Sequence, residues 1–177
     1  MYVVAKEFKP KMFFYLSFQG VENRNSGSPL DKWRFLVGEW KGKSKDEFGE
    51  KGVTESVAVF SMEPSERFIM ALGEAWNACR LVDKSISLLF YDNNEQKFKR
   101  KSFFSYGFVN NEVEYAGNDN EIKFDIKIEP LPKQFKGIRW RSFIRKISEN
   151  TVALGLEMAK REEGFKRYGE TVLVKTN

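Results

Sequence analysis

The side chains that most often carry chemistry in proteins are sparse in this chain of 177 residues. It has no histidine and a single cysteine, Cys79, so the commonest general base, the commonest metal ligand and the usual activator of a cysteine nucleophile are missing. The sequence contains no Ser-His-Asp arrangement, metal-ligand cluster, phosphate-binding loop or dinucleotide fingerprint. We therefore predict no catalytic residue, no metal site and no cofactor, although carboxylates and tyrosines leave acid–base catalysis open as an alternative.

A basic and aromatic segment, Arg139-Trp140-Arg141, supplies the first candidate binding residues. In a strand over 137–147 the two arginines lie on one face and Trp140 on the other. Either the arginines face solvent and Trp140 faces the interior, or the arginines point inward and hold an anion. An inward arginine needs a fixed anionic partner, for which Glu74 and a ligand carboxylate are the two candidates.

Aromatic residues supply the other candidates, because they form 15% of the chain. Such rings favour strands and line apolar pockets. Trp40, Trp76 and Tyr168 are the aromatic candidates besides Trp140, and packing in the core is the alternative for Trp40 and Trp76. The predicted ligand-binding set is therefore Trp40, Glu74, Trp76, Arg139, Trp140, Arg141 and Tyr168.

Strands must position these residues. After residue 36, segments of alternating polarity are separated by short polar turns at intervals of roughly 8–12 residues. The pattern predicts about ten strands, with turns that include 46–52, 82–84, 92–95, 110–111, 118–120 and 148–150. No helical segment is long enough for a parallel crossover, so consecutive strands should pair antiparallel.

The predicted fold class is all-β: an antiparallel up-and-down barrel of about ten strands, with a short N-terminal helix plugging one end. Closure removes the two exposed edges of such a meander. Side chains alone cannot fill a barrel of about ten strands, so we expect an internal cavity. The helix should begin at Ser28-Pro29 and end before Gly38, and Trp40 should pack at the floor of the barrel.

Residues 1–28 form a predicted N-terminal extension, and 29–177 form the barrel domain. The extension could be an extra strand, a flap or a tail. Its segment 12–18 imitates a signal peptide but is too short and lacks a cleavage site. The single cysteine and the absence of a bilayer-length apolar run fit a cytoplasmic location. The oligomeric state stays open, with a homodimer as one alternative.

The stretch Phe35-Leu36-Val37-Gly38-Glu39-Trp40-Lys41-Gly42, where the helix meets the first strand, resembles the calycins, which include lipocalins and fatty-acid-binding proteins. It is most similar to uncharacterised prokaryotic barrels related to nitrobindin, which share a leading Leu-x-Gly-x-Trp-x-Gly, a Tyr-Asp after a middle strand (here Tyr91-Asp92) and a late basic strand. The resemblance covers about residues 30–175. It implies a ligand held inside the barrel.

Two family sites do not carry over. Nitrobindin-type barrels hold haem through a proximal histidine, and this chain has none, so we do not expect haem. Fatty-acid-binding proteins hold a carboxylate with an inward arginine and tyrosine from late strands. Arg167 and Tyr168 are neighbours that point to opposite faces of a strand, so they do not reproduce that pair.

We therefore predict a small-molecule binding protein whose ligand is apolar or amphipathic, with an anionic ligand left open. One alternative is binding of a nucleic acid or another polyanion by Lys97, Lys99, Lys101, Arg139, Arg141 and Arg145. The net charge of +5 is moderate, and 25 acidic residues are interspersed with 30 basic ones, which favours a mixed solvated surface. The other alternative is an enzyme acting inside the cavity, which would show a carboxylate or tyrosine with a strongly perturbed pKa facing it.

Overall fold

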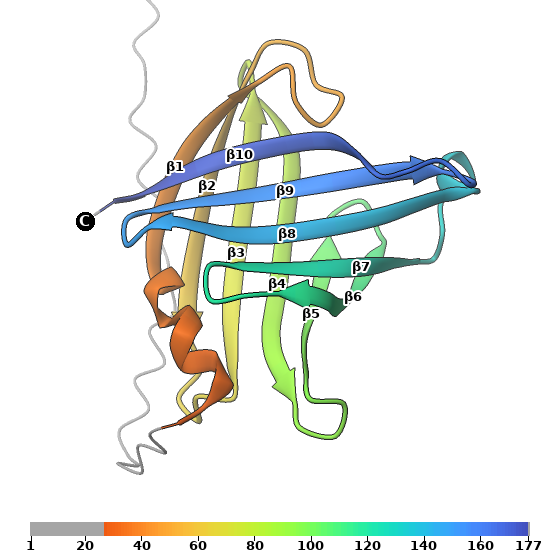
Figure 1. The fold of residues 1–177 in the computed structure, drawn as a ribbon. Coiled ribbons are helices and arrows are strands. Elements are labelled where there is room, and N and C mark those ends of the chain that lie inside the picture. The colour runs from red at the N-terminus through yellow and green to blue at the C-terminus, as the bar shows by residue number, and fades with distance from the viewer. Residues whose placement is uncertain (1–26, 177) are drawn as a thin grey trace, which may run out of the picture.

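Ten antiparallel strands close into a barrel in the computed structural model, which describes residues 27–176 (Figure 1). Each strand pairs with its neighbours in sequence, and the first strand pairs with the last, which confirms the predicted fold class. The predicted extension 1–28 lies almost entirely outside the described residues and stays a prediction. In chain order the elements are η1 (Pro29–Leu36), β1 (Gly38–Lys45), β2 (Val53–Met62), β3 (Phe68–Asn77), β4 (Arg80–Asp92), β5 (Lys97–Phe104), β6 (Val109–Gly117), β7 (Glu121–Glu129), η2 (Lys133–Phe135), β8 (Ile138–Ser148), β9 (Thr151–Lys160) and β10 (Lys166–Thr176).

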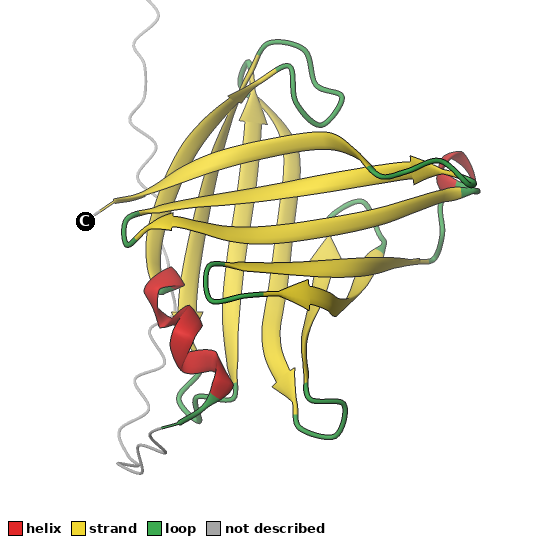
Figure 2. Cartoon of the chain, in the orientation of Figure 1, coloured by secondary structure: helices red, strands yellow, loops and turns green. Residues whose placement is uncertain are grey.

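A short 3₁₀ helix, η1, closes one end of the barrel (Figures 1 and 2). Ser28 caps it, since its Oγ accepts a hydrogen bond from the backbone N–H of Leu30 at 3.3 Å, and Pro29 follows the cap. Leu30, Trp33 and Leu36 are buried, so the helix contributes its apolar side to the core as predicted. Among the described residues, no helix has the length and apolar character needed to cross a membrane.

Trp40 on β1 packs against the C-terminal end of η1. Its side chain is 0% exposed, and its indole Nε1 donates to the carbonyl of Leu36 at 2.6 Å. Gly42 follows on the same face, where a Cβ would lie 2.1 Å from the carbonyl oxygen of Val172 on β10. Glycine is therefore required at this contact between the first and last strands.

Two predicted turns lie inside strands instead. Segment 82–84 belongs to β4, because the chain reverses earlier, at Ala78 and Cys79, whose φ angles of 46° and 66° are typical of a two-residue hairpin turn. Segment 110–111 belongs to β6, because the turn that precedes β6 is formed by residues 105–108. Asp83 and Asn110 are therefore strand residues of the barrel wall.

The loops gather at two opposite ends because the strands run alternately up and down. The helix η1 lies at the same end as the β2–β3 and β4–β5 turns (Figure 1). The β1–β2 loop (46–52), the β5–β6 loop (105–108) and the β7–β8 connection with η2 belong to the other end. We call this second end the mouth.

Candidate functional site

The barrel encloses a cavity of about 450 Å³ on the side of the mouth. Residues of the β1–β2 and β5–β6 loops and of η2 contribute to its lining, together with inward side chains of the strands. A smaller space of about 100 Å³ adjoins it and is bounded by core residues such as Phe60, Ile69 and Leu89. The main cavity has a size that suits a small organic molecule.

Seven aromatic side chains line the cavity in an unbroken series of ring contacts, which we call the aromatic arc. Most come from the mouth loops, and Trp140 and Tyr168 come from the starts of β8 and β10. Edge-to-face and offset contacts of this kind stabilise the rings against one another. The centroid distances are 5.0 Å for Phe104–Phe108, 6.0 Å for Tyr106–Phe108, 6.4 Å for Phe108–Phe135, 5.4 Å for Phe135–Trp140, 5.1 Å for Trp140–Tyr168 and 6.3 Å for Phe48–Tyr168.

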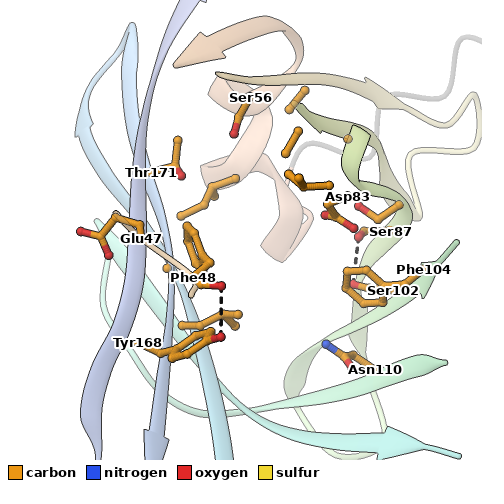
Figure 3. Close-up of a pocket in the computed structure, with 18 of the residues that line it drawn as sticks. Glu47, Phe48, Ser56, Asp83, Ser87, Ser102, Phe104, Asn110, Tyr168 and Thr171 are labelled. Atoms are coloured by element: carbon orange, nitrogen blue, oxygen red, sulfur yellow. Dashed lines mark hydrogen bonds between the residues drawn. The ribbon is translucent and has the colours of Figure 1, made fainter. Parts of the chain in front are cut away.

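Polar side chains lie on the inner face of β4, β5 and β6. In Figure 3, Asp83, Ser87, Ser102 and Asn110 stand along one wall, across the cavity from Tyr168. Ser87 Oγ and Ser102 Oγ are hydrogen-bonded at 2.8 Å. The cavity is therefore amphipathic, because polar side chains and aromatic rings share its lining.

A buried ion pair joins this wall to β8. Arg100 Nε and Nη2 donate to Glu112 Oε2 at 3.0 and 2.5 Å, and Ser102 donates to Glu112 Oε1 at 3.1 Å. Ser142 also hydrogen-bonds Glu112, and the Arg100 guanidinium lies 5.1 Å from the Phe124 ring centroid. Neither Arg100 nor Glu112 belongs to the predicted ligand-binding set. The alternation of side chains along a strand could have predicted that Arg100 faces inward. If Lys99 and Lys101 of β5 face solvent, the residue between them faces the interior.

Ion pairs neutralise almost every charged residue that lines the cavity. Glu47 pairs with Arg167 at 2.6 Å and Glu50 with Arg80 at 2.6 Å, while Glu74 pairs with Lys84 at 2.9 Å. Arg100 and Glu112 neutralise each other inside the barrel. Among the described residues, Asp83 is the one charged side chain of the lining without an ion-pair partner.

Asp83 is also partly desolvated. Its Oδ1 is buried without a hydrogen-bond partner in the protein. Burial raises the pKa of this carboxyl from 3.8 to about 6, and a hydrogen bond from the backbone N–H of Lys84 offsets part of that rise. Asp83 is therefore ionised at neutral pH in surroundings that disfavour its charge.

Two further polar atoms of the lining lack a partner among the described residues, namely Asn110 Oδ1 and Trp140 Nε1. Each of these residues is 8% exposed. Buried polar groups are nearly always hydrogen-bonded, so atoms of this kind in a cavity wall are the groups that a bound molecule or water satisfies. They provide an acceptor and a donor on different sides of the cavity.

Two of the predicted binding residues, Trp140 and Tyr168, come together in the cavity with ring centroids 5.1 Å apart. The Tyr168 hydroxyl donates to the carbonyl of Phe48 at 3.0 Å, which ties the β1–β2 loop to β10. Glu74 contributes to the lining, but its carboxylate binds Lys84. Its side chain is therefore engaged outside the cavity.

The other predicted binding residues lie away from the cavity. Trp40 packs above the plug, and Trp76 is 38% exposed. Arg139 donates to the carbonyl of Glu163 at 2.8 Å, while Arg141 donates to Asp125 at 2.7 Å and lies 3.9 Å from the Phe165 ring centroid. Of the two orientations left open by the sequence, the structure has Trp140 inside and both arginines outside.

Acidic neighbours neutralise much of the basic surface that suggested polyanion binding. Lys99 pairs with Asp92 and Glu95 at 2.8 and 2.7 Å. Arg145 pairs with Glu170 at 2.9 Å, as Arg141 does with Asp125. These cations are engaged in ion pairs, which weakens the case for a nucleic-acid surface.

Few of the described lining residues are of types that ligate haem iron. Tyr106 and Tyr168 are the iron-ligating residue types among them, and the Tyr168 hydroxyl already hydrogen-bonds to Phe48. Within residues 27–176 no group of three or more Asp, Glu or Cys side chains is placed to hold a metal ion.

Comparison with known proteins supports the fold alone. No family model and no curated protein matches the chain. The crystal structure of Rv2717c from M. tuberculosis is similar, with a TM-score of 0.62 over 84% of this chain and 97% of that chain. The two sequences are 14% identical, so the similarity shows a shared barrel and does not extend to the cavity residues.

Proposed function

We propose that the protein binds a small, largely apolar or amphipathic molecule inside its barrel. The observation that carries this proposal is the cavity of about 450 Å³, lined by the aromatic arc together with a smaller number of polar groups. A site of this composition buries the apolar body of a ligand and orients it with few polar contacts. The calycin resemblance of the stretch 35–42 supports the same proposal, since ligands of that family lie inside the barrel.

A neutral apolar dye tests this proposal. We expect Nile red to bind the purified protein saturably with one site, and native mass spectrometry to show a small-molecule adduct or a dye complex at the same stoichiometry. Ser56→Phe should reduce dye affinity at least about tenfold, because Ser56 points into the cavity (Figure 3) and a phenyl ring there would take up space that the dye needs.

The matched control is Ser56→Ala, which removes the hydroxyl without filling space and should retain dye binding. Circular dichroism and thermal unfolding would confirm that both variants fold. Absence of saturable binding in the parent protein, or equal binding by Ser56→Phe and Ser56→Ala, would contradict the proposal.

An enzyme acting in the same cavity is the second candidate function, and Asp83 is the observation that favours it. A lining carboxylate with a pKa of about 6 meets the condition stated for that alternative, since such a group can accept a proton at neutral pH. We rank it second because no described residue hydrogen-bonds to Asp83 Oδ1 and so orients it as a catalytic base. Product formation that disappears in Asp83→Asn would reverse the ranking.

A further inference from the structure

We propose that the cavity selects a protonated amine carried on an apolar or aromatic body, with Asp83 as the counter-charge and the mouth aromatics around the ammonium group. This inference rests on the proposed function, because it names the chemical class of the ligand for the same cavity.

The charge balance of the cavity favours a cation. Arg100 is the one basic side chain of the described lining, and Glu112 holds it with two hydrogen bonds. An anionic ligand would therefore meet no free positive charge, and it would meet the unpaired carboxylate of Asp83. A carboxylate in a partly desolvated site is stabilised by an opposite charge that comes with its own hydrogen-bond donors.

The register of the strands places Asp83 beside the aromatic arc. Asp83, Ser85 and Ser87 alternate along the inner face of β4, and Ser85 pairs with Phe104 on β5. Tyr106 follows Phe104 in the mouth loop. Burial raises the pKa of the Tyr106 hydroxyl, and the negative charge of Asp83 adds to that rise. Figure 3 shows Asp83 and Phe104 along the same wall. A carboxylate next to aromatic rings is the arrangement that stabilises an organic cation, because the faces of the rings carry partial negative charge.

Asn110 provides a second acceptor on this wall. It pairs with Ser102, the inward residue two positions before Phe104 on β5, so Phe104 lies between the strands that carry Asp83 and Asn110. Both Asp83 Oδ1 and Asn110 Oδ1 lack a donor from the described residues. An ammonium group supplies the N–H donors and the positive charge that Asp83 Oδ1 lacks, whereas a neutral hydrocarbon satisfies neither acceptor.

Three naphthalene probes of matched shape test the inference: 1-naphthylmethylamine, 1-naphthalenemethanol and 1-naphthaleneacetate. We measure their affinities by isothermal titration calorimetry with the full chain at pH 7.5. The amine should bind about tenfold or more tightly than the alcohol, and the carboxylate should bind most weakly. Asp83→Asn should remove the preference for the amine while leaving the affinity for the alcohol within about twofold.

A matched control variant is Glu55→Gln, because Glu55 lies on the outer face of β2 and pairs with Lys43. It removes one negative charge without touching the cavity, so it should leave the amine preference unchanged. Lowering the pH from 7.5 to 5 should weaken amine binding by the parent protein, because Asp83 becomes protonated while the amine keeps its charge.

The outcomes separate the two proposals. If none of the three probes binds and Nile red does not bind either, the proposed function fails. If the alcohol or the carboxylate binds as tightly as the amine, or if Asp83→Asn keeps the amine preference, the cavity still binds small molecules but the inference about its ligand class is wrong.

Discussion

Asp83 and Glu112 are both acidic side chains that line the barrel cavity, and their partners differ completely. Glu112 accepts hydrogen bonds from Arg100, Ser102 and Ser142, so its charge is compensated inside the protein. Asp83 has one backbone hydrogen bond and no ion pair. Glu112 is therefore stabilised by groups within the protein. The charge of Asp83 destabilises the folded state, and a ligand of opposite charge can offset that effect.

The raised pKa of Asp83 predicts how stability depends on pH. The folded state holds the Asp83 proton up to a pH of about 6, whereas the unfolded chain releases it near 3.8. The folded state therefore binds more protons between these values, and the contribution of Asp83 to the free energy of unfolding falls as the pH rises from about 4 to 6.

Asp83→Asn should abolish this dependence. At pH 7.5 we expect the variant to be more stable than the parent by about 1–2 kcal/mol, with the difference vanishing near pH 4. Urea unfolding at the two pH values measures it. Asp119→Asn, a change at an exposed turn residue, is the control and should change stability little at either pH. Equal stability of Asp83→Asn and the parent at pH 7.5 would show that the carboxylate is not desolvated in solution.

The Arg100–Glu112 pair predicts a strong effect that a second substitution relieves. Glu112→Ala leaves the guanidinium of Arg100 in the interior without its anion and should lower the free energy of unfolding by about 3–5 kcal/mol. The double variant R100M/E112L removes both charges and should recover at least half of that loss. Denaturant unfolding measures the free energy of unfolding of both variants. A double variant no more stable than Glu112→Ala would contradict the prediction that the unpaired charge of Arg100 causes the loss.

Two elements, η1 and β1, divide the barrel interior into a packed end and a hollow end. Trp33 of η1 packs edge-on against Phe98 at 6.3 Å, and Trp40 of β1 covers the helix from above. The part of the barrel interior that side chains do not fill lies toward the mouth, where aromatic residues of the loops line the cavity. The element that plugs one end thus determines where a ligand has room.

The role of Trp40 in this plug predicts a loss of stability rather than of binding. Trp40→Ala should cost about 3–5 kcal/mol, because it empties a fully buried site and removes the hydrogen bond to Leu36. Trp76→Ala is the control and should cost much less, since Trp76 is 38% exposed. If Trp40→Ala left stability unchanged and abolished Nile red binding, Trp40 would belong to the ligand site instead of the scaffold.

At the scale of the whole molecule, pairing between β1 and β10 closes the ten strands around the cavity. The seam depends on Gly42, where a side chain would collide with the backbone of Val172. Hydrogen bonds from the last strand to the β1–β2 loop, such as that from Tyr168 to Phe48, fasten the mouth at the same seam. Ten strands closed in this way leave an interior that the inward side chains line but do not fill.

The sequence by itself determined the barrel and the plug, because alternating polarity, turn spacing and helix capping are local signals, and it left Trp40 between the core and the ligand site. It also reduced the orientation of the basic strand to two alternatives. Only the tertiary structure decided that Trp140 faces inward and Arg139 and Arg141 outward. Alternation along one strand assigns residues to two faces but does not say which face is the inner one. The tertiary structure likewise decided that Arg100 meets Glu112 and that Asp83 has no ion-pair partner. Those facts depend on which side chains from distant strands share the interior, and no spacing within one strand encodes them.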